Sequence, residues 1–264
     1  MASTNKTETL LLNQWLGNDI SAREDFNSDN KKIDDWAKTV TTQLKENTQN
    51  FNELNKRILS NGNKNYYVST AGNDVTGDGS QEKPFKTIQK AFDMIPRLVT
   101  NIFTIEILDG TYDGFNLYSI TGSGLIIIKS NSGNRDNVII SHAEFNHCYI
   151  QVLLEGVTIN TTSRHKITSY GCSRLEIKNC KLESASTNDG VIAEYSNCYL
   201  HDTLISNQQT AIKSIVAGFI LAQNCSGSGN GTALSAIYGG VLAKDNNTIT
   251  GTTQENSGIG GVIR

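Results

Sequence analysis

The chain of 264 residues is short of charge, of proline and of long apolar runs. Its 23 basic and 26 acidic residues leave a net charge of −3, and no cluster of Lys and Arg occurs, which argues against a nucleic-acid-binding protein. No apolar stretch approaches the roughly 18 residues of a membrane-spanning helix, so membrane insertion is not expected. The apolar run near the N-terminus, Leu10–Leu12, is too short for the core of a signal peptide.

Candidate metal ligands are also few. The five cysteines are an odd number, contain no CxxC pair, and are predicted to be buried, reduced thiols. His147 beside Cys148 is the only neighbouring Cys/His pair, which is too little for a zinc site. The loop of residues 71–80 offers Asp74 and Asp78 as calcium ligands, but it lacks the EF-hand pattern, and a tight loop of Asx turns is the preferred interpretation. No metal and no cofactor are predicted.

Asparagine, by contrast, is abundant, at 29 residues, and 23 glycines accompany it. Asparagine tolerates left-handed backbone conformations and bonds its own backbone, so this composition favours a protein with many tight turns. The pattern along the chain predicts four segments: 1–25, an N-terminal segment; 26–60, a helical stalk; 61–100, a linker and entry cap; and 101–264, a repeat of short strands.

The stalk is predicted from a seven-residue apolar register. Residues 1–60 contain no proline and one glycine, so no proline interrupts a helix there. Position a was assigned to Phe26, Ile33, Val40, Asn47 and Leu54, and position d to Asn30, Ala37, Leu44, Phe51 and Ile58. The stripe is too narrow to cover a globular core, and an Asn at position a is a known register-fixing residue. A parallel, self-associating coiled coil is therefore expected; the alternative is an amphipathic helix packed on its own chain.

The last segment contains an internal repeat of apolar strands separated by polar turns. Aligned segments begin at Leu154, Ile177, Leu200, Leu221 and Leu242, at spacings of 23, 23, 21 and 21 residues. Leucine-rich repeats have a similar length, but their fixed Leu and Asn/Cys spacing does not recur. A mainly-β fold, a parallel β-helix of about seven coils, fits better, since equivalent residues then stack into ladders. In this alignment Cys180 stacks with Val157 and Thr203.

The same alignment indicates no catalytic site. Cleavage of a glycosidic bond normally needs two carboxyl groups about 5–10 Å apart. Glu155 falls against Lys178 and His201, and Asp202 against Asn179 and Gly156, so neither ladder pairs two acids. Asp113 and Asp136 lie in turn regions, and Asp189 and Glu194 flank one strand; the four histidines form no Ser/His/Asp or Cys/His pattern. No catalytic residue is therefore predicted.

A rigid face rich in Asn, Ser, Thr and Tyr suits sugars, which take hydrogen bonds from amides and stack on aromatic rings. The tyrosines that could contact a sugar are Tyr149, Tyr170, Tyr195, Tyr199 and Tyr238. For each of them, packing in a core or an interface is the alternative.

Two stretches resemble known families. Tyr67–Asp74, Gly77–Gly79, Lys83–Ile88 and Ala91 resemble the entry motif of pectate-lyase-like right-handed β-helix proteins, in which a strand and a short helix cap the first coil. Separately, Leu12–Trp15, Asp19, Arg23, Asp25–Asn27 and Ile33–Asp34 are similar to the N-terminal segment of tail fibres and tailspikes from phages of Gram-positive bacteria. The order of attachment segment, coiled coil and β-helix strengthens the second resemblance.

The second resemblance implies a homotrimeric structural protein of the virion tail, assembled in the host cytoplasm, that binds a cell-surface polysaccharide or teichoic acid. Attachment to a baseplate or tail protein would fall to Trp15, Asp19, Arg23, Phe26 and Asn27. The trimer contacts would be Ile33, Ala37, Val40, Leu44, Asn47, Phe51, Leu54 and Ile58. Two alternatives stay open: a glycan depolymerase (a lyase or a glycosidase), and a purely structural connector that carries a separate receptor-binding protein.

Overall fold

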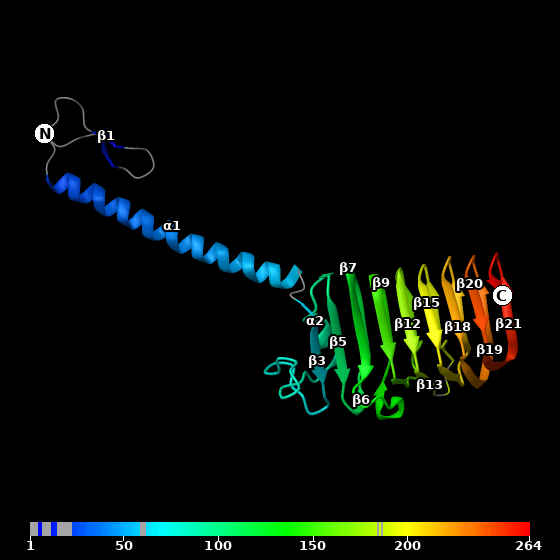
Figure 1. Cartoon of the computed structure of the whole chain (residues 1–264). Helices are drawn as coiled ribbons and strands as arrows, with labels where there is room; N and C mark the ends of the chain where they lie inside the picture. The colour runs from blue at the N-terminus through cyan, green and yellow to red at the C-terminus, as the bar shows by residue number, and fades with distance from the viewer. Residues whose placement is uncertain (1–4, 7–11, 15–22, 59–61, 184, 186) are drawn as a thin grey trace. The chain divides into compact units, whose positions relative to one another are not determined.

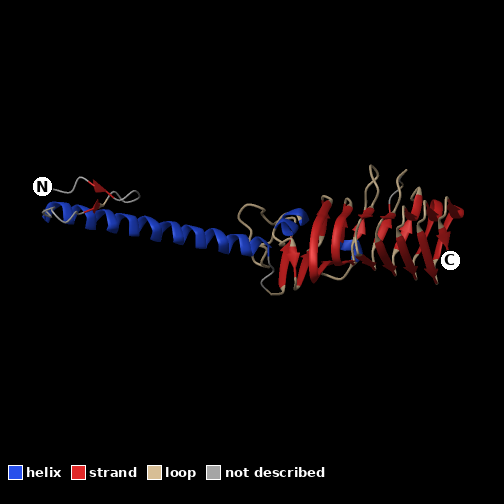
Figure 2. Ribbon diagram, turned by 90° about the horizontal axis from the view of Figure 1, so that it is seen from above, coloured by secondary structure: helices blue, strands red, loops and turns tan. Residues whose placement is uncertain are grey.

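The computed structural model describes residues 5–6, 12–14, 23–58, 62–183, 185 and 187–264, in two compact units, Met1–Asn55 and Lys56–Arg264 (Figure 1). In the first unit, β1 (Asn5–Lys6) and β2 (Asn13–Gln14) form an antiparallel pair. The helix α1 spans Arg23–Ile58, as the absence of proline predicts. The second unit is a stack of β-strand coils, seen from above in Figure 2.

One stripe of α1 is apolar and uncovered in the single chain. The exposed fractions of Phe26, Leu44 and Phe51 are 59%, 65% and 62%, and Ile33, Ala37, Val40 and Asn47 are exposed as well. Leu54 and Ile58 lie in the helix, with side chains outside the described part. Apolar side chains of this size that are more than half exposed are costly in water, so the stripe fits a helix that needs a partner. The coiled coil and the trimer stay predictions.

The heptad positions a and d assigned to the two apolar sets of α1 must be exchanged. In a heptad, d follows a by three residues, and the next a follows d by four. Asn30 follows Phe26 by four residues, so the set that begins at Phe26 occupies d and the set that begins at Asn30 occupies a. The argument about register therefore applies to Asn30, because Asn47 lies at d.

Three parallel ladders build the second unit, one on each face of the coil. The first face stacks β3 (Lys64–Val68), β5 (Ile102–Ile107), the end of β7 (Phe115–Ser130), the end of β9 (Ala143–Glu155), β12 (Arg174–Lys178), β15 (Asn197–His201), β18 (Phe219–Gln223), β20 (Val241–Asp245) and β22 (Val262–Ile263). Figure 1 shows the middle strands of this face side by side. Every pairing in the second unit is parallel, which confirms the mainly-β, parallel β-helix; its right-handed sense stays a prediction.

The other two faces complete each coil. The second face stacks β6 (Gly110–Tyr112), β8 (Val138–Ile140), β10 (Thr158–Ile159), β13 (Lys181–Glu183), β16 (Leu204–Ser206) and the starts of β19 (Ser226–Ile237) and β21 (Thr248–Gly258). The third face stacks the starts of β7 and β9, β11 (Ile167–Tyr170), β14 (Val191–Glu194), β17 (Thr210–Ile215) and the ends of β19 and β21. The short strand β4 (Leu98–Val99) pairs with Thr121 and Gly122 of β7, between the third and first faces.

Apolar ladders fill the interior. On the first face, one buried column runs through successive coils as Phe103, Ile126, Val152, Leu175, Cys198, Ile220 and Leu242. All five cysteines are buried and free, as predicted. The stacking of Cys180 with Val157 and Thr203 is also confirmed, because Lys181 N bonds Val157 O at 3.0 Å and Leu204 N bonds Cys180 O at 3.0 Å. Burial raises the pKa of Cys180 to about 12, so this thiol stays protonated.

The predicted register was wrong in the last two coils. Leu200 pairs with Ala222, which pairs with Lys244, so the spacings there are 22 residues instead of 21. Leu221 therefore points outward, because a slip of one residue moves a side chain to the opposite face. Leu242 still points inward, but it belongs to the column of Ile220.

The entry cap follows the predicted order of strand, loop and short helix. The helix α2 spans Ile88–Asp93, with Thr87 as its N-cap. Within the loop, the Asp74 carboxylate accepts hydrogen bonds from Lys86 N at 2.7 Å, Thr87 N at 3.1 Å and Thr87 Oγ1 at 2.7 Å. Asp78 Oδ1 accepts one from Ser80 N at 2.9 Å, so the loop is the tight Asx structure that was preferred.

Asparagine occupies most of the left-handed turn positions at the corner between the first and second faces. Asn179, Asp202, Asn224 and Asn246 stack there with φ of +48°, +52°, +53° and +50°. Their side chains bond along the stack: Asn246 Nδ2 donates to Asn224 Oδ1 at 2.8 Å, and Asn224 Nδ2 to Asp202 Oδ1 at 3.3 Å. Asn is among the few residues that tolerate this left-handed conformation, which explains part of the asparagine excess. A 3₁₀ turn, η1 (Arg135–Asn137), precedes β8.

Candidate functional site

The corner between the third and first faces also repeats a left-handed residue in each coil. The column consists of Ser119, His147, Gly171, Tyr195, Val216, Tyr238 and Ile259, with φ between +45° and +63°. For bulky or β-branched residues this conformation is unusual and costs on the order of 1–3 kcal/mol each. Such strain in successive coils indicates that this corner has a role beyond closing the turn.

Aromatic side chains gather along this corner. We call Tyr118, His147, Tyr149, Tyr170, Tyr195 and Tyr238 the aromatic corner; its five tyrosines are exposed by 39% to 55%. The ring of His147 lies 5.0 Å from that of Tyr170, which lies 5.8 Å from that of Tyr195, both edge to face. The rings of His147, Tyr170 and Tyr195 therefore contact one another, and the tyrosines still present roughly half of their surface to a ligand.

Polar groups lie between these rings. On the outer surface of the third face, Asn146 pairs with Tyr118 on one side and with Tyr170 on the other, and Glu194 follows Tyr170 in the next coil. Asn146 Nδ2 donates to Asn116 Oδ1 at 3.0 Å, which fixes the orientation of the amide. The guanidinium of Arg97 lies 4.3 Å from the centre of the Tyr118 ring. The corner thus combines aromatic surface with hydrogen-bonding groups.

Four of the five predicted tyrosines lie in this corner, and the fifth does not. Tyr199 is half-buried on the outer surface of the first face, where the Arg174 guanidinium lies 4.5 Å from its ring centre. Tyr118 and His147 were missed, because they join the column only through the register of β7 and β9.

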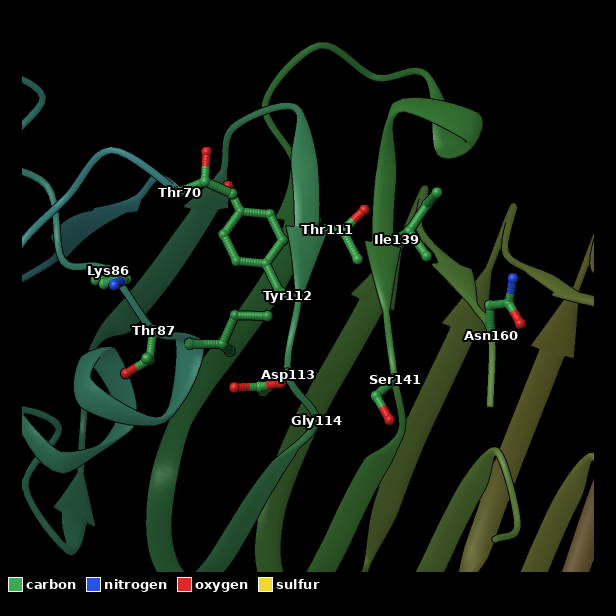
Figure 3. Close-up of a pocket in the computed structure, with 11 residues that line it drawn as sticks. Thr70, Lys86, Thr87, Thr111, Tyr112, Asp113, Gly114, Ile139, Ser141 and Asn160 are labelled. Atoms are coloured by element: carbon green, nitrogen blue, oxygen red, sulfur yellow. The ribbon is translucent and has the colours of Figure 1, made fainter. Parts of the chain in front are cut away.

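A separate cavity of about 350 Å³ lies beside the entry cap (Figure 3), and we call it the cap pocket. Its walls come from the loop before α2 and from the ends of β6, β8 and β10. They are formed by Thr70, Lys86, Thr87, Ile88, Thr111, Tyr112, Asp113, Gly114, Ile139, Ser141 and Asn160. The Tyr112 hydroxyl donates to Leu108 O at 2.7 Å, and burial raises the pKa of Tyr112 to about 12, so the ring is a neutral wall.

Three of the acids considered for catalysis have basic partners. Asp189 is buried and lies 3.0 Å from Lys213 Nζ, while Glu155 lies 3.0 Å from Lys178 Nζ, as the alignment predicted. Asp136 lies 3.2 Å from Lys181 Nζ, outside the lining of the cap pocket that contains Asp113. The structure therefore does not bring Asp113 and Asp136 together, and it places Asp189 in an ion pair.

A histidine next to the cap pocket is held neutral. Desolvation, and then the nearby Arg164 guanidinium, lower the pKa of His142. Arg164, which can only donate, bonds His142 Nε2 at 2.7 Å, so the ring proton lies on Nδ1 and faces Ser141 Oγ at 3.3 Å. Arg164 also lies 3.1 Å from Glu144. These bonds hold the imidazole in one orientation behind the wall of the cap pocket.

The predicted attachment residues are not assembled into a described site. Trp15 and Asp19 lie outside the described residues, and Arg23 is the first residue of α1, with its side chain not described. Phe26 and Asn27 are exposed on the first turns of that helix. Their role stays a prediction.

The described residues contain neither a cluster of metal ligands nor a membrane-spanning helix. No group of three or more His, Cys, Asp or Glu side chains that could hold a metal ion occurs in the part of the chain that the structure describes. Within the same residues, no helix has the length and apolarity to cross a membrane.

Comparison with known proteins gives one distant likeness. No family model matches the sequence, and no curated protein matches it. Among solved structures, the chain is similar to a protein titled rhamnogalacturonan lyase, at 13% identity and a TM-score of 0.38, over 72% of this chain and 75% of that chain. The parallel β-helix is established by the strand pairing of this chain.

Proposed function

We propose that this chain is the subunit of a trimeric fibre or tailspike of a phage tail, or of a phage-tail-like particle, and that it binds a glycan of the host cell surface. Residues 1–25 attach it to the tail or baseplate, and the stripe of α1 joins three chains. The aromatic corner is the observation that supports glycan binding.

The chemistry of the corner suits a linear glycan. The C–H face of a sugar ring is apolar and packs flat on an aromatic ring, while its hydroxyls bond amides and carboxylates. Neighbouring coils are about 4.8 Å apart along the stack. Tyr118 and Tyr170 are two coils apart, with Asn146 between them, and Tyr195 lies one coil beyond Tyr170, directly after Glu194. A glycan chain running parallel to the stack therefore meets the three rings in turn, and Asn146 and Glu194 lie beside them to bond its hydroxyls.

Ion pairs argue against a catalytic role for three of the acids considered in the sequence. A depolymerase needs a free acid and a free base or nucleophile at the bond that breaks. Asp189, Glu155 and Asp136 each lie within 3.2 Å of a lysine, so these carboxylates already have a cationic partner.

Removal of two neighbouring rings tests the proposal. The double variant Tyr170→Ala/Tyr195→Ala is expected to bind cell-wall glycan at least about tenfold more weakly, since two stacked rings contribute on the order of 1–3 kcal/mol. Sedimentation of the full-length protein with purified wall polysaccharide and teichoic acid from Gram-positive cells measures this. Tyr199→Ala, a tyrosine of the first face, is the matched control and should bind like the parent.

Other results would contradict the proposal in distinct ways. If the double variant binds the glycan as well as the parent protein does, the aromatic corner is not the glycan-binding site. Release of reducing ends or unsaturated sugars would identify a depolymerase. Failure of the parent protein to bind any wall fraction would favour the connector.

A further inference from the structure

We infer that the cap pocket is a second carbohydrate site, which holds a single neutral sugar ring of the host glycan. This inference deepens the proposed function and rests on it. The cap pocket belongs to the second face and the entry cap, whereas the aromatic corner belongs to the third and first faces, so the two sites are formed by different elements.

The size of the cap pocket restricts its ligand. A cavity of about 350 Å³ is at the small end of the range for ligand sites, roughly 300–1,000 Å³. It therefore admits one small ring, and not a folded segment of a protein partner.

Polar groups on the walls are unused by the protein. The carboxylate of Asp113 and the ammonium of Lys86 make no hydrogen bond or ion pair with any other described residue, and the same is true of the Thr111 hydroxyl and the Asn160 side-chain amide. The neighbouring acid of the loop, Asp74, is by contrast fully engaged with backbone N–H groups and the Thr87 hydroxyl. Lys86, Asp113 and Asn160 lie on different sides of the cap pocket (Figure 3).

Apolar groups complete the walls. Ile88, Ile139 and Tyr112 line the cap pocket as well, and the Tyr112 hydroxyl is bonded to the backbone of Leu108. The cap pocket thus pairs an apolar wall for the C–H face of a sugar with an acceptor, a cationic donor, a hydroxyl and an amide for its hydroxyls.

The charges select a neutral ligand. Among the lining residues, Lys86 contributes one positive charge and Asp113 one negative charge, so the site carries no net charge. A phosphate or a carboxylate would approach Asp113 against Coulomb repulsion, and a cation would approach Lys86 in the same way. Hydroxyls, however, donate to the carboxylate and accept from the ammonium at no such cost, and hydrogen bonds to charged groups are the stronger ones.

The wall is held in place before a ligand arrives. A Cβ at Gly114 would lie 2.0 Å from His142 Nδ1, so the backbone packs directly on the imidazole there. The imidazole is fixed in turn by Arg164 at 2.7 Å and by Ser141 at 3.3 Å. A preformed wall loses little conformational entropy on binding, which favours even a small ligand.

Saturation-transfer NMR on the full-length protein tests the inference, with the methyl glycosides of glucose, galactose and N-acetylglucosamine as probes. At least one of them is expected to bind, and Asp113→Ala and Thr111→Val should each weaken it, the first by about tenfold or more. Asp136→Ala, which removes an exposed acid elsewhere, should leave the affinity unchanged. Inorganic phosphate should not compete.

The outcomes separate this site from the aromatic corner. The Tyr170→Ala/Tyr195→Ala variant should lose polymer binding and keep methyl glycoside binding. If no methyl glycoside binds the parent protein, or if Asp113→Ala binds it equally well, the cap pocket is not a sugar site, whether or not the polymer binds. Competition by phosphate would overturn the neutral class of ligand. Circular dichroism melts of each variant verify that it folds.

Discussion

Replacement of Asn230 by alanine is expected to destabilise the solenoid by about 3–5 kcal/mol. Asn230 is 2% exposed and lies just after an irregularity in β19. Its Nδ2 donates to Ile205 O at 3.1 Å and to Thr250 O at 3.0 Å, and its Oδ1 accepts from Gln208 N at 3.0 Å. Alanine would leave three backbone groups without this partner, two in the preceding coil and one in the following coil, at a cost of roughly 1–3 kcal/mol for each buried group.

Urea unfolding at fixed protein concentration measures this loss. Asn256→Ala is the matched control, since Asn256 is exposed on the third face and its loss should change the free energy of unfolding by less than about 0.5 kcal/mol. A cost below 1 kcal/mol for Asn230→Ala would show that the amide does not bind the three coils together.

Replacement of Lys166 by methionine is expected to have the opposite sign and to stabilise the fold at pH 7. Lys166 is 0% exposed, and its Nζ donates only to Thr161 O, at 2.6 Å, among the bonds of the described residues. Desolvation lowers the pKa of Lys166 to about 8. At pH 7 the amine is charged in both states, so folding moves a charge out of water, and methionine removes that cost of up to about 3 kcal/mol.

The pH dependence identifies the cause. Between the folded pKa of about 8 and the ordinary value of 10.5, the unfolded chain holds more protons than the folded one, so the parent protein gains stability as pH rises through this window. The advantage of Lys166→Met should therefore shrink from pH 7 to pH 10. Lys213→Met is the control: it should destabilise, because it removes the 3.0 Å partner of the buried Asp189. A methionine variant that is less stable than the parent at pH 7 would contradict this account.

The repeat could be predicted from the sequence because each coil places apolar residues at a near-constant spacing. The pairing of Glu155 with Lys178, and of Lys178 with His201, followed from that spacing. The register failed at Ala222 and Lys244, where a small residue and a charged one stand in the column that Leu154, Ile177 and Leu200 fill. Alignment by large apolar residues alone then selects Leu221, which points outward.

The sites could be predicted only in part. The tyrosines of the corner were candidates because exposed aromatic rings suit sugars, but the turn residue His147 carries no such signal. The cap pocket was not predicted at all. Its walls bring together Thr70, Asp113 and Asn160 from separate coils, and only the stacking of the coils makes them neighbours.

The proposed fibre requires three chains to assemble through α1. Light scattering on the purified full-length protein measures this assembly. We expect a mass three times the 28.8 kDa of one chain at micromolar concentration, and one third of that mass for a variant with Leu44→Asp and Phe51→Asp in the exposed stripe. A mass of 28.8 kDa for the parent protein would contradict the trimer, and with it the fibre.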